Sequence, residues 1–201
     1  MIIAAAVVGL VFGSVALVAS SSSSTFQQSA LQGALEDETR RTLQRIVDAV
    51  QMSGSGSIAG VPQFPLWSDS MNFDTVRDVA ATDGSITWSP SRLQLEYVSG
   101  ETDNGIDDNR NGIDDEGCVV LIVARGLPDE RRVVLSRWVR EYAASELPDG
   151  ADENGNGLAD ERGLCFTRSG STLGIRLTLE RRDSKGRVST CTTETTVQLR
   201  N

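Results

Sequence analysis

The sequence lacks the residue types on which most enzymes and transition-metal sites depend. Its 201 residues include no His and one Lys, which removes the usual general base and the commonest transition-metal ligand. Its three Cys, Cys118, Cys165 and Cys191, form neither CxxC nor a zinc-binding spacing. There is no phosphate loop and no sequence context for a Ser or Cys nucleophile. We therefore expect a protein that is not an enzyme, with no catalytic residue, no organic cofactor and no small-molecule substrate.

Positive charge is also scarce. The formal net charge is −9, and no DNA- or RNA-binding motif accompanies the arginines at positions 131, 132, 137 and 140, which fit one solvated face of a strand or helix. We expect no nucleic-acid partner. The hydrophobic content is 39% of the chain, enough for one core.

The negative charge is concentrated in two similar segments. Residues 103–117 read DNGIDDNRNGIDDEG, and residues 149–163 read DGADENGNGLADERG. The charge is −6 from Glu101 to Gly117 and −5 from Glu146 to Gly163, so the remaining residues sum to about +2. The acidity is therefore local, which indicates two sites that collect negative charge.

Both segments share the pattern D-x-N-x-N-G-[IL]-x-D-E. Side-chain oxygens at positions 1, 3 and 5, Gly at 6, a backbone carbonyl at 7 and an acid at 9 are the first nine positions of a calcium loop. The Glu at position 10 is a further candidate ligand. The predicted metal ligands are Asp107, Asn109, Asn111, Ile113 (carbonyl), Asp115 and Glu116 in the first segment, and Asp152, Asn154, Asn156, Leu158 (carbonyl), Asp160 and Glu161 in the second.

The match to an EF-hand is incomplete. Position 12, which is Glu in an EF-hand, is Cys118 in one segment and Gly163 in the other. Both segments resemble the EF-hand-like calcium loops of dockerin and thrombospondin type 3 repeats, a resemblance that implies two Ca²⁺ ions. One such segment could be a solvated acidic turn, but two copies with the same spacing argue against that. Mg²⁺ fits less well, because it prefers a small octahedral shell rich in water.

The chain begins with a long apolar run. Residues 1–19 read MIIAAAVVGLVFGSVALVA, and as a helix they would extend about 28 Å, close to the hydrocarbon thickness of a bilayer. A signal peptide is the alternative, since VAS at 18–20 resembles a cleavage site, but no positively charged segment precedes the run. Residues 26–52 follow as an amphipathic helix. Its apolar stripe comprises Leu31, Leu35, Leu43, Ile46, Val47 and Val50.

The region from VVGLVFG through SSSSTFQQSALQGALEDETRRTLQRIVDAVQMSG resembles the N-terminal region of the type IV pilin and pseudopilin superfamily, and PilW-like minor prepilins in particular. The final TVQLRN also resembles the last strand of those proteins. The resemblance implies a filament assembled from copies of this chain through residues 1–25, insertion in the inner membrane before assembly, and an extracellular, cell-surface location. One departure stands out: family members usually carry Glu at the fifth mature position, whereas this sequence has Ala5 and no acid before Glu36.

The remaining residues have β character. We predict a hairpin from residues 85–88 and 93–98, a buried strand at 118–124, a strand at 131–142 that could instead be helical, and a final hairpin on either side of the turn at 183–186. We therefore predict an α+β fold, in which an N-terminal helical region (1–53) packs on an antiparallel β-sheet head (58–201) that carries two calcium loops. In an exported protein two of the three Cys could pair, and the sequence leaves open which two.

These observations together predict a structural subunit of a pilus-like filament. The calcium loops would stiffen the head, where the ion concentration outside a cell could fill sites of about 0.1 to 1 mM affinity. Two alternatives remain open. One is a membrane-anchored, calcium-dependent adhesin or binding module that does not polymerise, and the other is a minor pilin or secretion pseudopilin rather than a major subunit.

Overall fold

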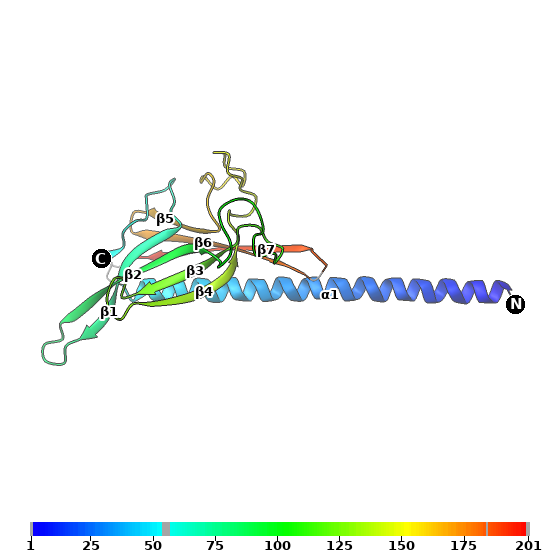
Figure 1. Cartoon of the computed structure of the whole chain (residues 1–201), viewed down its shortest axis with the longest axis horizontal. Helices are drawn as coiled ribbons and strands as arrows, with labels where there is room; N and C mark the ends of the chain where they lie inside the picture. The colour runs from blue at the N-terminus through cyan, green and yellow to red at the C-terminus, as the bar shows by residue number, and fades with distance from the viewer. Residues whose placement is uncertain (1, 54–56, 184, 200–201) are drawn as a thin grey trace.

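The structure is a computed structural model that describes residues 2–53, 57–183 and 185–199, with side chains from Thr25 onward. These residues form one helix, α1 (Ile2–Gln51), followed by strands. Figure 1 shows the C-terminal half of α1 against the sheet, while the N-terminal half extends beyond it. The strands are β1 (Ser70–Val79), β2 (Ile86–Tyr97), β3 (Gly117–Val123), β4 (Arg131–Val139), β5 (Leu164–Ser169), β6 (Thr172–Arg182) and β7 (Val188–Gln198).

The part of α1 with described side chains buries one face against the sheet. It contacts β4, β6 and β7, as expected for a helix with apolar side chains every three or four residues. Each fully buried Leu or Ile contributes about 1.5–3 kcal/mol, so this face fixes the helix to the head. Its buried apolar side chains are Leu35, Leu43, Ile46, Ala49 and Val50, with Leu31 and Val47 partly buried beside them.

The strands form one antiparallel sheet in the order β1-β2-β3-β4-β6-β5, and β7 pairs with β6. The predicted α+β class is therefore confirmed. The sheet curls between β4 and β6, which share a single pair, Val139 with Leu179. Gly163 lies at this junction, where it accepts a hydrogen bond from Thr178 N. A Cβ at Gly163 would lie 2.0 Å from the carbonyl oxygen of Arg140, so only glycine fits here.

Several strand predictions are confirmed. The segment predicted at 118–124 is β3, the segment at 131–142 contains β4 and is not helical, and β6 and β7 form the predicted final hairpin. The hairpin predicted from residues 85–88 and 93–98 is wrong, because both segments belong to the single strand β2. The strand that forms a hairpin with β2 is β1, which was not predicted.

The tripeptide Ser89-Pro90-Ser91 explains the error, because it resembles a turn between two strands. In the structure Pro90 stands opposite Asp74 of β1, and β3 joins β2 only from Arg92 onward. The missing N–H of proline therefore falls where β2 needs no hydrogen bond to β3, which is the position in a sheet that tolerates proline.

The three cysteines are buried and free. Cys118 lies on β3, Cys165 on β5 and Cys191 on β7. Burial, together with the smaller effect of the charge of Glu161, raises the pKa of the Cys165 thiol to about 12. At neutral pH this side chain is therefore a packed thiol rather than a reactive thiolate.

The apolar run at residues 1–19 lies outside the residues whose side chains are described, so its predicted burial in a membrane or filament core is not tested. Within the residues whose side chains are described, which begin at Thr25, no helix is long and apolar enough to span a membrane.

Candidate metal centre

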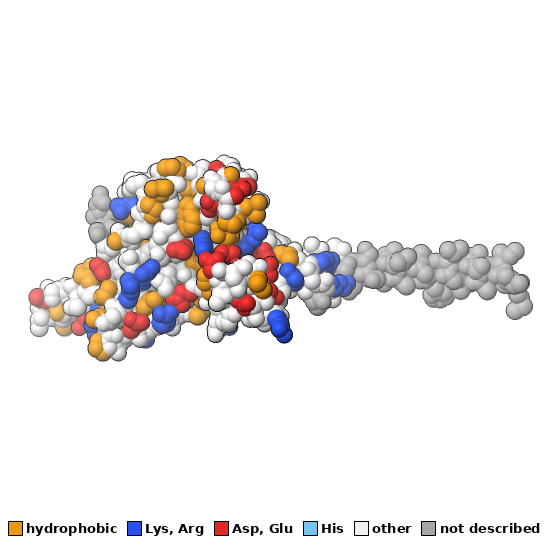
Figure 2. All heavy atoms as spheres, turned by 45° about the horizontal axis from the view of Figure 1, so that its top comes forward, with side chains coloured by type: hydrophobic (Ala, Val, Ile, Leu, Met, Phe, Trp, Pro, Cys, Tyr) orange, Lys and Arg blue, Asp and Glu red, His pale blue; other side chains and the backbone are white. Residues whose placement is uncertain are grey.

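Both acidic segments lie at one end of the sheet. Loop 1 (residues 103–117) joins β2 to β3, and loop 2 (residues 149–163) belongs to the connection from β4 to β5. Gly117 at the start of β3 stands opposite both Tyr97 of β2 and Val139 of β4. The two connections therefore leave the sheet side by side (Figure 1). Figure 2 shows acidic side chains, in red, gathered over this region.

In loop 1 the side chains at positions 1, 3 and 5 turn inward and bind the backbone of the same loop. Asp107 accepts hydrogen bonds from Asn111 N at 3.0 Å and Gly112 N at 2.6 Å. Asn109 Oδ1 also accepts from Asn111 N, at 3.0 Å, and Asn111 Oδ1 accepts from Ile113 N at 3.0 Å. Gly112 has φ 95°, which favours glycine. Ile113 is 3% exposed and anchors the loop to the protein interior.

Loop 2 repeats this arrangement bond for bond. Asp152 accepts from Asn156 N at 3.1 Å and from Gly157 N at 2.7 Å. Asn154 Oδ1 accepts from Asn156 N at 3.1 Å, and Asn156 Oδ1 accepts from Leu158 N at 2.8 Å. Gly157 has φ 87°, and Leu158 is 4% exposed. The sequence repeat is therefore also a structural repeat.

The position-10 glutamates are buried against these turns. Glu116 is 1% exposed, and its Oε1 accepts hydrogen bonds from the amide groups of Asn109, at 2.8 Å, and Asn111. Glu161 is fully buried, and its Oε1 accepts from Asn154, at 2.9 Å, and Asn156. The Oε2 atoms of both glutamates are buried without a hydrogen-bond partner among the described residues. A buried carboxylate oxygen without a donor is costly, and a cation would satisfy it.

A second pair of buried acids was not among the predicted ligands. Glu101 is 7% exposed and Glu146 is 1% exposed. Glu101 Oε1 accepts from Asn109 N at 2.8 Å, and Glu146 Oε1 accepts from Asn154 N at 3.1 Å. Burial raises the pKa of Glu146, and the charges of Glu161 and Glu153 raise it further.

The acids at position 9 bind the first residues of each loop. Asp115 accepts from Asn104 N at 3.3 Å and from Gly105 N at 2.5 Å, both through Oδ2. Asp160 Oδ1 accepts from Asp149 N at 3.0 Å and Gly150 N at 2.9 Å. These two aspartates close each loop by joining its start to its end.

Asp115 also belongs to an acidic triad that could hold a metal ion. The carboxylates of Asp103, Asp115 and Glu141 place one oxygen each within 4.8 Å of the others. Burial raises the pKa of Glu141, and Asp115 and Asp103 add to this effect while Arg162 opposes it. Asp103 and Glu141 were not predicted as ligands. Asp103 lies outside the ten-residue loop pattern, and Glu141 lies just after the end of β4, far from loop 1 in sequence.

Arg162 partly neutralises this triad and connects the two loops. It belongs to loop 2, yet its guanidinium nitrogens lie 3.4 Å from Asp103 Oδ2 and 3.5 Å from Glu141 Oε1. Arg162 Nη1 also donates to the hydroxyl of Tyr97 at 2.5 Å. Burial raises the pKa of Tyr97 to about 12. A cation at the triad would compete with Arg162. In contrast, Asp107 and Glu116 of loop 1 form no ion pair with an arginine among the described residues.

The structure therefore brings together most predicted ligands of each loop. Those at positions 1, 3, 5 and 10 share one hydrogen-bond network, whereas the position-9 aspartates bind backbone N–H groups. The repeat itself offers a signal for the missed acids, because Glu146 follows Glu101 by the same interval that separates Asp152 from Asp107. Asp103 and Glu141 have no such signal, since only the fold brings them together.

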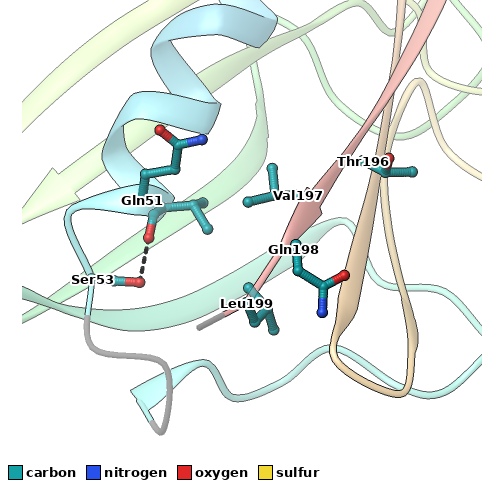
Figure 3. A pocket seen from close by; sticks show the side chains of 7 residues that line it. Gln51, Ser53, Thr196, Val197, Gln198 and Leu199 are labelled. Atoms are coloured by element: carbon teal, nitrogen blue, oxygen red, sulfur yellow. Dashed lines mark hydrogen bonds between the residues drawn. The ribbon is translucent and has the colours of Figure 1, made fainter. Parts of the chain in front are cut away.

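A cavity elsewhere offers no comparable chemistry. It has a volume of about 420 Å³ and lies between the C-terminal end of α1 and β7 (Figure 3). At its edge Ser53 Oγ donates to Val50 O at 2.5 Å. None of the described residues around it is acidic or basic; they are Val50, Gln51, Ser53, Thr196, Val197, Gln198 and Leu199.

Comparison of the chain with models of known protein families, with curated proteins and with solved structures finds no match.

Proposed function

We propose that this protein is a structural subunit of an extracellular filament of the type IV pilus kind. The observation that carries the proposal is the form of α1. Its C-terminal half packs on β4, β6 and β7, and its N-terminal half extends beyond the sheet (Figure 1). That extension coincides with the apolar run at residues 1–19. A long apolar helix needs lipid or other helices around it, and copies of the same chain would supply them in a filament.

The proposed assembly has two stages. The apolar run first holds the subunit in the inner membrane, and residues 1–25 then pack against the same residues of other copies in the filament core. Because no acid precedes Glu36 in this sequence, this packing rests on apolar side chains. The β-sheet head is left on the outside of the filament at the cell surface.

The two loops are proposed as calcium sites that hold the head rigid. Their donors are carboxylate, amide and carbonyl oxygens, which are the ligands that Ca²⁺ prefers. Support comes from the duplicated network of hydrogen bonds and from the unpartnered Oε2 atoms of Glu116 and Glu161. An ion at about 100 times its dissociation constant would stabilise the folded state by roughly 2.7 kcal/mol per site.

Assembly is tested by electron microscopy of material recovered from the cell surface. Wild-type protein is expected in filaments, and V11D is expected to form none, because a charge inside an apolar helix opposes burial. The matched control is V133D, which makes the same change at a side chain that is 45% exposed on β4. Filaments from V11D would contradict the proposed packing.

The second candidate, a membrane-anchored adhesin that does not polymerise, is favoured by one observation. Across the β1–β2 hairpin, Val76 pairs with Trp88 and Val79 with Ile86, and all four side chains are more than 40% exposed. An exposed apolar ribbon of this kind suits partner binding. Discrete particles in place of filaments in the wild-type preparation would favour this function.

A further inference from the structure

We propose that Glu101 and Glu146 are cation ligands, and that the calcium ion of each loop is held between two buried glutamates, Glu101 with Glu116 in loop 1 and Glu146 with Glu161 in loop 2. This inference rests on the proposed calcium binding and extends it. Each loop lacks the EF-hand acid at position 12, and a glutamate that precedes position 1 would supply its carboxylate instead.

The two glutamates assigned to the loop 1 site, Glu101 and Glu116, contact the same asparagine. Asn109 donates its backbone N–H to Glu101 Oε1 at 2.8 Å and its side-chain amide to Glu116 Oε1 at 2.8 Å. Loop 2 repeats this with Asn154, which donates to Glu146 Oε1 at 3.1 Å and to Glu161 Oε1 at 2.9 Å. Here Glu146 Oε2 also accepts from Asp160 N at 3.1 Å, and the oxygen without a partner among the described residues is Glu161 Oε2. Both acids therefore contact the position-3 residue, one through its backbone N–H and the other through its side chain, which is one of the proposed ligands.

The burial of Glu101 calls for a positive charge. Its side chain is 7% exposed, and its Oε2 has no hydrogen-bond partner among the described residues, as is also true of Glu116 Oε2. Neither acid forms an ion pair within the described part of the chain. Two buried carboxylates without a compensating charge destabilise the folded protein. A divalent cation between them removes this cost.

The resulting donor set suits calcium. Loop 1 would offer Asp107, Asn109, Asn111, the carbonyl of Ile113 and the two glutamates, within the six to eight oxygen ligands that Ca²⁺ takes. Asp115 already accepts backbone hydrogen bonds at the start of the loop. Glu101 and Glu116, in contrast, each keep one oxygen without a donor among the described residues.

A simpler role for Glu101 would be to hold the backbone N–H of Asn109. The substitution E101Q separates the two roles, because the Gln carbonyl oxygen can still accept that hydrogen bond but carries no charge. The matched control is D114N, which removes one negative charge from an exposed position of the same loop. E146Q is the corresponding variant in loop 2.

The test is calorimetric titration of the full purified chain with Ca²⁺. The wild type is expected to bind two ions, and E101Q and E146Q are each expected to weaken one site by about tenfold or more, since affinity follows the number of charged ligands. D114N is expected to stay within about threefold of the wild type, because an exposed charge is screened. In EGTA, E101Q should melt no earlier than the wild type, because the hydrogen bond from Asn109 N is kept and a buried charge is removed.

Two results would overturn the inference, and they are distinguishable. If the wild type binds two ions and E101Q weakens binding no more than D114N does, the glutamate is not a ligand although the calcium sites stand. If the wild type takes up no calcium, the proposed sites themselves are wrong and the inference falls with them.

Discussion

Loops 1 and 2 have the same pattern of backbone hydrogen bonds but differ in how their buried negative charge is balanced. In loop 2, Arg176 of β6 places Nη1 2.8 Å from Glu161 Oε1. In loop 1, the equivalent Glu116 forms no ion pair among the described residues. Gly and Asn at fixed intervals therefore determine the shape of both loops, whereas the surrounding sheet determines their charge. Loop 1 should depend on a cation more strongly than loop 2.

The largest expected effect separates the two position-10 glutamates. With calcium at about 100 times its dissociation constant, loss of calcium binding in E116Q or in E161Q should remove roughly 2.7 kcal/mol of stability, which lowers the unfolding midpoint by about 5–10 °C in a protein of this size. E161Q should in addition lose the contribution of its ion pair with Arg176. In EGTA the two should differ. E116Q removes an unpaired buried charge and should not destabilise the folded protein. E161Q leaves Arg176 without its buried partner and should therefore lower the unfolding midpoint. Thermal unfolding with and without EGTA checks both, and equal behaviour in EGTA would contradict the comparison.

The next effect comes from making loop 2 resemble loop 1. R176M leaves Glu161 buried without its ion pair and should cost about 2 kcal/mol in EGTA, somewhat less than for a fully buried pair because the arginine side chain is 20% exposed. Saturating calcium should restore part of this loss. Chemical denaturation measures the change. E194Q is the control, since Glu194 also binds Arg176 but is 71% exposed, and it should cost less than about 1 kcal/mol.

A smaller effect is expected where the loops meet. The Tyr97 hydroxyl accepts from Arg162 and lies 3.4 Å from Glu141 Oε1. Y97F removes these hydrogen bonds and should cost about 1 kcal/mol, measured by denaturation in EGTA and in calcium. Because no calcium ligand is changed, the loss should be the same in both conditions. A loss confined to the calcium-bound protein would place a cation at the triad of Asp103, Asp115 and Glu141.

The smallest effect concerns the one left-handed position at which the loops differ in residue type. Arg110 has φ 62° and the equivalent Gly155 has φ 71°. In R110G, relief of the unfavourable φ offsets the added freedom of the unfolded chain, so stability should change by no more than about 0.5 kcal/mol. Denaturation midpoints test this. A large loss would show that the Arg110 side chain supports loop 1 in a way that loop 2 does not need.

The features predicted correctly from sequence are those that local spacing determines. Apolar residues three and four apart identified the buried face of α1, and continuous or alternating β-branched residues identified β3 and the β6–β7 hairpin. The two turns followed from oxygen donors at alternate positions before Gly112 and Gly157. Each of these patterns lies within a few residues of the chain.

The features that were missed depend on contacts between distant segments. Strand β1 has only Met71 and Phe73 fully buried within a largely polar segment, so pairing with β2 rather than its own pattern makes it a strand. Arg176 meets Glu161 only because β6 passes beneath loop 2. The position of each loop relative to the sheet therefore determines whether an arginine balances its buried glutamate, and no local sequence motif predicts this.

The central claim is that calcium in the two loops stabilises the head of a filament subunit. Its most direct test is electron microscopy of the native filaments with and without EGTA, with the unfolding midpoint followed in parallel. The account predicts filaments that fray on chelation and a midpoint that falls by about 5–10 °C for each site emptied. Intact filaments with an unchanged midpoint would contradict it.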